Sequence, residues 1–479
     1  MTGLVSMVDW INGVIWSPPL VGLCLGAGLY LSIRLGFPQV RYLKEMAKLA
    51  VRVEKSEAGI SPFQAFAATV GSRVGMGNVA GVATAIYFGG PGAVFWMWLI
   101  AFFGCGAAFV ETVLAQAYKE KKGNGEYVGG PAYYIEKGLK IKWLAVIFAL
   151  ATVIGPGITM PGVHTHSIAA TFEDAFGMPQ LLTGLLLCST LGIVVFGGVK
   201  RIGRVAEFLS PVMCVIYVLL TVGVCFVYFD KLPSVIAVIF KSAFGLEEAY
   251  SGIIGAMIAW GVKRGVYSNE AGQGSGAIVA AAAETSHPAK QGLVQVFSIY
   301  IDTMVICTAS AFIILMTDSY SITDGSGGMI VDNLPGIQYG ILYIQNGLNI
   351  SYPGIWASKV LAVAVVMFVF TSLMGYYYQA EGNISYMFKD SNSALLAFRC
   401  IFILSTFSGV LIEGGVLWNM ADIGVGFMAW INIIVILILS SQGVKMLRDW
   451  QKQKHDGLDP LFNPVSINIE DKTGAWSRK

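Results

Sequence analysis

Eleven apolar segments run through the chain, each close to the ~20 residues that a helix needs to cross ~30 Å of hydrocarbon. Charged residues make up only 13% of the chain, whereas soluble domains carry about 25%. The pattern predicts an all-α polytopic membrane protein. The segments are Ser17–Gly36, Pro62–Phe88, Ala93–Ala117, Trp143–Gly162, Leu181–Phe196, Phe208–Phe229, Tyr250–Ala283, Leu293–Met316, Ile355–Tyr377, Ala394–Ile412 and Val416–Ser440.

The positions of lysine and arginine predict the orientation of these spans, because cytoplasmic loops carry an excess of both. If the first span runs from outside to inside, 25 of the 31 basic residues fall on the cytoplasmic side. Three loops on the opposite side, Gly162–Gln180, Ser319–Pro353 and Glu413–Gly426, contain none. The sequence therefore predicts an N-terminus outside and a C-terminus in the cytoplasm.

Two of the apolar segments contain a stretch that is poorly suited to a continuous helix. Gly71–Gly81 reads GSRVGMGNVAG, and its four glycines weaken a helix. Ala256–Gly276 is also rich in glycine and polar in its middle, about half a chain further on. Broken helices in a bilayer occur where the backbone lines a cavity, and paired breaks in inverted repeats mark transporter sites. The alternative is a glycine-rich helix that packs closely on its neighbours.

The GMGN motif at positions 75–78 has backbone groups suited to two ligands. The N–H groups of Met76 and Gly77, at the start of a half-helix, would suit a carboxylate. Carbonyl groups between Gly71 and Val74 would suit a small hard cation such as sodium, and the Asn78 amide oxygen could add a ligand.

Several stretches resemble the alanine/glycine:cation symporter family, the sodium:alanine symporters. They are GSRVGMGNVAGVATAIYFGGPGAVFWMW (71–98), KRGVYSNEAGQGSGA (263–277), HPAKQG, YIDT (300–303) and the first span. The resemblance covers nearly the whole chain. It implies a LeuT-like 5+5 inverted repeat with one extra N-terminal helix, in a bacterial or archaeal inner membrane. It also implies a carrier, not an enzyme, that couples sodium entry to uptake of a small neutral amino acid without any cofactor.

This resemblance predicts four parts along the chain. Residues 1–60 hold the extra transmembrane helix and a cytoplasmic linker, 61–248 and 249–442 are the two five-helix repeats, and 443–479 form a polar, partly disordered cytoplasmic tail. One departure from the family is Met76, where a small threonine is common. Because methionine changes the pocket volume, the choice among alanine, glycine, serine, glutamine and D-isomers stays open.

Carried over residue by residue, the resemblance implies two sets of ligands. The substrate set is the carboxylate-binding turn Gly75, Met76 and Gly77, the side-chain wall at the second break formed by Trp260 and Gly261, and the polar contact Asn269. The sodium set is Gly71, Val74, Asn78, Thr371 and Ser372. The alternative for Thr371 and Ser372 is that each hydroxyl bonds a carbonyl of its own helix.

Other polar residues in the spans admit structural explanations. Glu270 with Arg264 is expected to form a scaffold ion pair or a gate, and Asp302 to contact a cation or cap a backbone group. His164 and His166 are expected in an outer loop, or at most as part of the outer vestibule, without a third metal ligand. The seven cysteines are scattered and lack a CxxC motif, which indicates free thiols.

Two other classes of function stay open. An intramembrane enzyme could use Ser275, although the GxSxG spacing is absent. A sensor or scaffold could bind ligand without flux. The absence of GxxxxGK[ST] argues against an ATP-driven pump. The expected partners are an amino acid, sodium and membrane lipid, and no nucleic acid.

Overall fold

The computed structural model describes residues 2–51, 60–122, 125–197, 199–354, 356–469, 471 and 473–476. The first half contains α1 (Thr2–Ile15), α2 (Pro18–Leu35), α3 (Pro38–Arg41), α4 (Leu43–Ala50), α5 (Pro62–Arg73), α6 (Ala80–Gly89), α7 (Gly92–Ala117), β1 (Glu120–Lys121), β2 (Tyr127–Val128), α8 (Pro131–Tyr134), η1 (Ile135–Leu139), α9 (Lys142–Ile154), η2 (Gly155–Thr159), α10 (Met160–Phe176), α11 (Gln180–Val195), α12 (Val199–Val227), η3 (Phe229–Lys231) and α13 (Leu232–Ala243).

The second half contains η4 (Glu248–Ile253), α14 (Ile254–Asn269), α15 (Ser275–Ala281), α16 (Pro288–Ile299), η5 (Tyr300–Cys307), α17 (Thr308–Met316), β3 (Ser321–Thr323), β4 (Met329–Asp332), α18 (Ile341–Ser351), α19 (Trp356–Phe388), α20 (Asn392–Ser408), α21 (Gly414–His455) and η6 (Pro464–Ile467). The strands form two antiparallel hairpins, β1 with β2 and β3 with β4.

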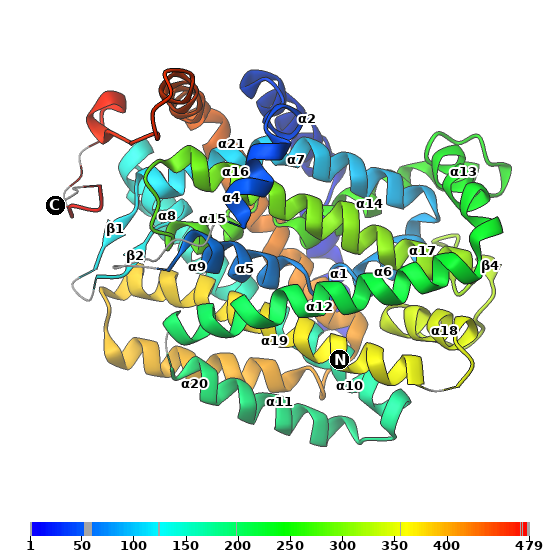
Figure 1. Ribbon diagram of the computed structural model, residues 1–479. Coiled ribbons are helices and arrows are strands. Elements are labelled where there is room, and N and C mark those ends of the chain that lie inside the picture. Colours follow the sequence, from blue (N-terminus) through cyan, green and yellow to red (C-terminus); the bar gives the residue numbers. More distant parts are fainter. Residues whose placement is uncertain are drawn as a thin grey trace.

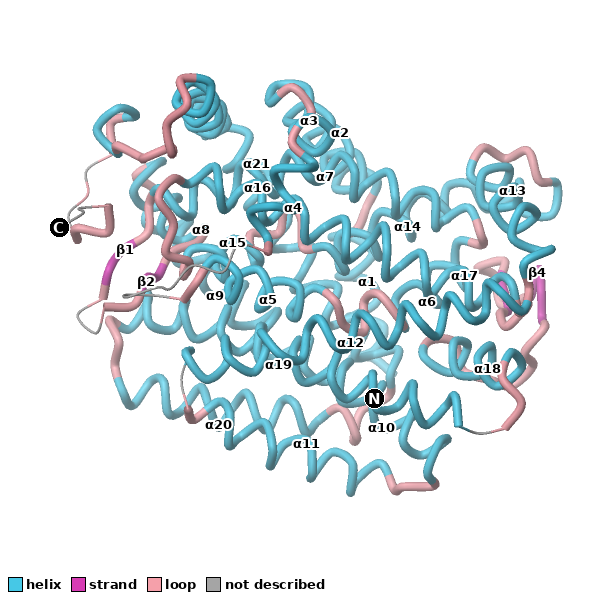
Figure 2. Tube along the Cα trace, viewed as in Figure 1, coloured by secondary structure: helices cyan, strands magenta, loops and turns pink. Residues whose placement is uncertain are grey.

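The long helices run roughly alongside one another in a bundle with two distinct ends (Figure 1). The β1–β2 hairpin and the C-terminal residues lie at one end, called here the β1 end. Helices α13 and α18 and strand β4 lie at the opposite end, called the β4 end (Figure 1). Figure 2 shows how little of the described chain is strand.

Every predicted span contains helix, and within the described residues seven helical stretches are long and apolar enough to cross a membrane. Shorter apolar helices include α6, α11 and α20. Large side chains face outward, as lipid-facing residues do: Phe208 and Phe226 of α12 are 71% and 77% exposed, and Leu404 of α20 is 70% exposed. The chain is therefore a multi-pass membrane protein.

The structure adds helix that the apolar segments did not predict. Helix α1 precedes the first predicted span and packs along α21, with Asn12 donating to Asn419 (2.8 Å). Helix α10 continues to Phe176, well beyond Gly162, and α21 continues to His455, well beyond Ser440. These extensions carry polar residues that pack against other helices, so hydropathy alone places their ends too early.

Both predicted breaks are present. Helix α5 ends at Arg73 and α6 begins at Ala80, while α14 ends at Asn269 and α15 begins at Ser275. The two pairs run in opposite directions: the chain entering α5 pairs with the chain leaving α15, through Ile60 N–H to Ala282 O (3.4 Å) and Glu284 N–H to Ile60 O (3.1 Å).

The second break differs in position from the expectation. Helix α14 is continuous through Trp260 and Gly261, and the interruption falls at residues 270–274, where Glu270, Gly272 and Gly274 have φ of +56°, +83° and +85°. Gly261 instead allows close packing, because a Cβ there would lie 2.6 Å from the Ala93 carbonyl oxygen of α7. A glycine pair at positive φ interrupts a helix more effectively than one glycine within it.

The sequence predicts a polar, partly disordered tail, and the described residues after α21 make defined contacts with the rest of the chain. Phe462 N–H donates to Ser286 O (2.9 Å), Ser286 Oγ donates to Pro460 O (2.9 Å), and Lys290 pairs with Asp459. The segment thus packs against the start of α16. There, burial lowers the pKa of His287, and its Nδ1 accepts the Ala289 N–H (3.1 Å).

Further along the tail, the Trp476 ring lies 4.6 Å from the Lys119 ammonium and 4.8 Å from the Phe462 ring. Lys119 also donates to Ala283 O (2.9 Å), just after α15. The tail therefore covers a contact between α7 and the inner end of the second interrupted helix.

Replacing Trp476 with alanine should release the tail. The variant loses a cation–π contact and an aromatic pair, together about 1–2 kcal/mol, so tail residues should be cut by trypsin roughly tenfold faster. Limited proteolysis followed by mass spectrometry measures this. Val465→Ala is the matched control, because Val465 is 72% exposed. Equal cleavage of both variants would show that Trp476 does not anchor the tail.

Candidate functional site

The first break presents main-chain groups without helical partners. Gly75 N–H donates to Asn78 Oδ1 (2.8 Å), and Gly81 N–H donates to Met76 O (2.8 Å). Within the described part of the chain, the N–H groups of Met76 and Gly77 have no acceptor, and the Val74 carbonyl has no donor. Two amides and a carbonyl are thus available to a ligand in a buried setting.

Gly75 lies against two polar side chains from other helices. A Cβ at this position would lie 2.2 Å from Ser372 Oγ of α19 and 3.1 Å from His164 Nε2 of α10. His164 is fully buried, its Nε2 has no partner, and its ring meets Tyr376 edge-on at 5.1 Å. The glycine is needed because any larger residue would occupy the space between these groups.

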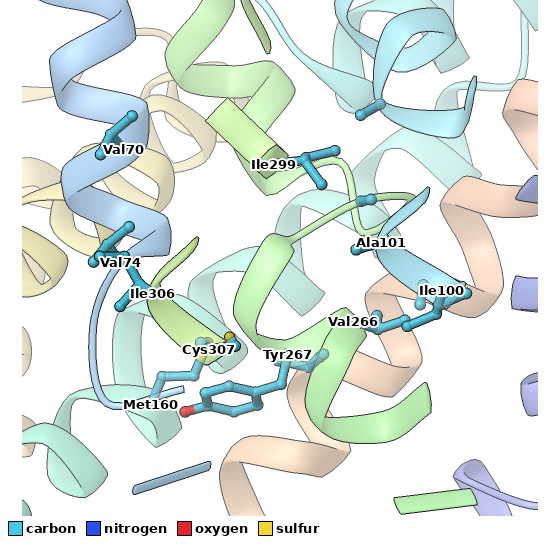
Figure 3. Close-up of a cluster of buried hydrophobic side chains, with 14 of the residues drawn as sticks. Val70, Val74, Ile100, Ala101, Met160, Val266, Tyr267, Ile299, Ile306 and Cys307 are labelled. Carbon is cyan, nitrogen blue, oxygen red and sulfur yellow. The ribbon is translucent and has the colours of Figure 1, made fainter. Parts of the chain in front are cut away.

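Apolar side chains enclose the same region. Figure 3 shows Val74 at the end of α5, with Ile306 and Cys307 of η5, Met160 of α10 and Tyr267 of α14 around the chain that leaves this helix. All five are buried. Such a wall keeps water from the break, which strengthens hydrogen bonds and ionic contacts inside it.

The predicted sodium residues are partly brought together. Ser372 Oγ donates to Gly71 O (3.2 Å), so a hydroxyl and a carbonyl oxygen from two helices are adjacent. Thr371 Oγ1 donates to Met367 O (2.8 Å), as the alternative interpretation expected. The Asn78 oxygen is engaged by Gly75 N–H. Neutral oxygens of this kind are the ligands that hard cations prefer.

Beside the first break, Asp302 collects donors from three elements. Its carboxylate accepts from Asn78 Nδ2 (2.6 Å), Ser268 Oγ (3.0 Å) and Thr303 Oγ1 (2.7 Å), and all four side chains are buried. The Asn78 amide therefore links the Gly75 turn to Asp302 of η5 and, through it, to α14. Among the described residues, no group of three His, Cys, Asp or Glu side chains could hold a metal ion.

The second break is held by Glu111, a residue that the sequence analysis did not assign to the site. Glu111 Oε2 accepts from Gly274 N–H (3.1 Å) and from Asn432 Nδ2 (2.8 Å), and Asn432 also donates to Gly272 O (3.0 Å). Glu111 and Asn432 come from α7 and α21. Asn269 acts locally, with Oδ1 accepting from Ala271 N–H (2.9 Å).

The expected pairing of Glu270 with Arg264 is wrong. Arg264 and Lys263 both bond Asp422 Oδ2 of α21, Lys263 at 2.7 Å. Glu270 accepts weakly from Gln379 (3.4 Å) and lies near Arg73, since a Cβ on Gly276 would be 2.6 Å from Arg73 Nη2 and 3.4 Å from Glu270 Oε2. Arg264 lies within α14, whereas Glu270 follows its last residue in the left-handed conformation, so the two side chains point in different directions.

The expectation for the histidines is wrong for His164, which lies inside α10 and is wholly buried. The available signal was the spacing of Met160 and His164, which places both on one face of a helix once α10 is extended. His166 faces a shallow cavity at the β4 end that Tyr339 and Trp418 also line.

A comparison with known families now identifies the class of protein. A family model described as the sodium:alanine symporter family matches residues 1–464. The chain belongs to the sodium:alanine symporter family. Membership indicates a carrier rather than an enzyme.

Three relatives are similar over nearly their full lengths. YrbD of Bacillus subtilis (strain 168), named as an inferred sodium/proton-dependent alanine carrier, is 48% identical over 478 residues, covering 99% of this chain and 98% of YrbD. GlnT of the same organism, named as a probable sodium/glutamine symporter, is 42% identical over 475 residues, covering 99% and 96%. The sodium/alanine symporter AgcS of Methanococcus maripaludis is 36% identical over 446 residues, covering 91% and 95%.

Two solved structures share the fold. MhsT in complex with L-phenylalanine superposes with a TM-score of 0.53 at 13% identity, covering 82% of this chain and 99% of MhsT. A sodium-coupled sialic acid symporter superposes with a TM-score of 0.50 at 11% identity, covering 97% of both chains. The expected LeuT-like inverted-repeat fold is confirmed.

Replacing Gly75 with alanine should weaken ligand binding at least tenfold, although the protein still folds. The added Cβ collides with Ser372 Oγ, and overpacking of this kind costs about 1–3 kcal/mol, enough for a roughly tenfold or larger loss of ligand affinity. Gly81→Ala is the matched control, because its Cβ would have no neighbour closer than 3.6 Å. Uptake assays and thermal unfolding in detergent should separate the two variants; similar activities would contradict this role for Gly75.

Replacing Glu111 with leucine should loosen the second break. Gly274 N–H and the Asn432 amide each lose an acceptor, at a cost of about 1–3 kcal/mol per buried group. Hydrogen exchange at residues 271–276 should rise and the unfolding temperature should fall, while Glu111→Gln, which keeps one acceptor oxygen, should lie nearer the wild type. An unchanged exchange rate in the leucine variant would refute the assignment.

Proposed function

We propose that the protein couples sodium entry to uptake of a small neutral amino acid of the alanine or glycine class. The main support is the unpartnered backbone at the first break, next to the Gly71 carbonyl and the Ser372 hydroxyl, in a member of the sodium:alanine symporter family. Its relatives are named for carriage of sodium with alanine or glutamine. No covalent bond is made or broken.

The proposed substrate site lies at the Gly75–Met76–Gly77 turn. The free N–H groups of Met76 and Gly77 bind the substrate carboxylate. His164 Nε2, buried and without a partner, contacts the polar end of the substrate, and Tyr267 and Met160 limit the size of its side chain. Asn269 shapes the second break, because its side-chain oxygen accepts a hydrogen bond from the Ala271 N–H.

The proposed sodium site adjoins this turn. The carbonyl oxygens of Gly71 and Val74 and the hydroxyl of Ser372 form its base, and Thr371 completes it after its hydroxyl turns from its own helix. Asn78 supports the turn, with its oxygen on Gly75 N–H. Sodium then orders the broken helix before the substrate binds.

The two repeats are residues 61–248 and 249–442, and residues 1–60 and 443–479 lie outside them. Alternating access results when the repeats move relative to each other around the breaks. The β4 end faces outward and the β1 end faces the cytoplasm of a prokaryotic cell, as the basic residues predict. Each sodium ion that enters releases about 2.3 kcal/mol per 100 mV of membrane potential, which drives accumulation.

Purified protein in proteoliposomes should accumulate radiolabelled L-alanine or glycine only under an inward sodium gradient. In Ser372→Ala, the sodium concentration for half-maximal uptake should rise about tenfold, equivalent to about 1.4 kcal/mol. Thr371→Val tests the remaining ligand. An equal rise in the sodium concentration for half-maximal uptake supports a role for Thr371 in the site, and an unchanged concentration contradicts that role.

Equal uptake in choline buffer would disprove sodium coupling. L-Glutamine belongs in the same panel because of the GlnT relationship. If glutamine alone is accumulated, the transport mechanism stands but the proposed substrate class is wrong.

A further inference from the structure

A further pocket lies between α1, α14 and α21, apart from both breaks. Its volume is about 260 Å³, enough to hold several water molecules. The lining residues are Asp9, Asn12, Gly13 and Trp16 of α1, Ala259, Trp260 and Lys263 of α14, and Asn419 of α21. We call it the α1 pocket.

The base of the α1 pocket carries a buried positive charge. Lys263 is 7% exposed; its ammonium bonds Asp422 Oδ2 (2.7 Å) and Asn12 Oδ1 (3.2 Å) and lies 4.6 Å from the Trp260 ring. An ammonium has three donors, so one is left for a ligand. Arg264 uses the same Asp422 oxygen, and two cations therefore share one carboxylate.

The opposite charge lies at the exposed rim. Asp9 is exposed and accepts from Asn419 Nδ2 (2.7 Å). Asn419 in turn accepts from Asn12 Nδ2 (2.8 Å), and Asn12 accepts from Lys263. A chain of carboxamides thus runs from a buried ammonium to an exposed carboxylate. Lys263, Arg264, Asp422 and Asp9 sum to zero charge, but the charge is separated along the pocket.

The walls suit a compact ligand with an apolar part. Trp16 and Trp260 supply indole rings, and Trp260 is held by stacking on Phe88 at 4.3 Å. The Trp16 Nε1–H is occupied by Asp422 O (2.9 Å), so its ring orientation is fixed. Indole faces attract ammonium groups and also cover aliphatic groups.

We infer that the α1 pocket binds a small zwitterionic amino acid, with its carboxylate toward Lys263 and its ammonium toward Asp9 and the indole rings. A simple anion in the pocket would be repelled by the like charge of Asp9, and a simple cation would be repelled by the like charge of Lys263. A zwitterion complements both charges. The choice of this ligand class rests on the proposed function. Since the lining has a cation at its base, binding here requires no sodium.

In the transporter, this pocket is a second amino-acid site, built in part by the helix that precedes the two repeats. It holds substrate without an ion, whereas the proposed site at Gly75 requires one. Trp260, expected to wall the central site, also lines this pocket.

The test measures binding of radiolabelled L-alanine to purified wild-type protein by equilibrium dialysis in a sodium-free potassium buffer. We expect saturable, sodium-independent binding, with affinity reduced at least tenfold in Lys263→Gln and in Asp9→Asn. Lys231→Gln is the control, since Lys231 pairs with Asp318 on the surface. Asp9 is exposed, so its substitution leaves folding intact even if Lys263→Gln lowers stability.

The outcomes are separable from those of the proposed function. Gly75→Ala should lose sodium-dependent uptake but keep sodium-independent binding. Absence of sodium-independent binding in the wild type, or unchanged affinity in both pocket variants, would overturn the inference. Competition by acetate as strong as by alanine, with none by methylammonium, would show an anion site and overturn it too. If the wild-type protein shows no sodium-dependent uptake, the proposed function is rejected, but the inference about the α1 pocket is not.

Discussion

Main-chain N–H and C=O groups inside a membrane have no water with which to form hydrogen bonds. The rest of this structure depends on which of these groups find a partner within the protein and which do not. Most are paired within long helices. At the two breaks they are not, and side chains from other helices take over: Asn78 at Gly75, and Glu111 with Asn432 at residues 272–274. Among the described residues of the first break, the Val74 carbonyl and the N–H groups of Met76 and Gly77 are left without a partner.

The two breaks are stabilised unequally. The second is fastened to α7 and α21 by a carboxylate and a carboxamide. The first is fastened mainly by its own Asn78, which then reaches Asp302. A break that supports itself can adjust to a ligand while its neighbour stays fixed, and this asymmetry suits a carrier in which ligand binding orders one helix against another.

Charged groups inside the bundle also lie beside polar or charged partners from other segments of the chain. Asp422 neutralises Lys263 and Arg264, Asp302 is surrounded by neutral donors, and Arg73 lies near Glu270. Each charged group thus joins helices that are distant in sequence. Because a buried charge without a partner is costly, these contacts restrict how far the helices can separate.

The sequence by itself determined the membrane class, the position of nearly every span and the first break. Hydropathy and glycine content act locally, and the bilayer imposes a fixed length on each helix. It also indicated the GMGN turn, since backbone exposure there follows from four nearby glycines.

Only the tertiary structure decided which side chains contact one another across helices. It moved the second break to residues 270–274, paired Arg264 with Asp422, buried His164 beside Gly75 and brought Glu111 to the second break. These contacts join residues up to 321 positions apart. Their formation depends on which helix faces pack together, and neither composition nor spacing specifies that.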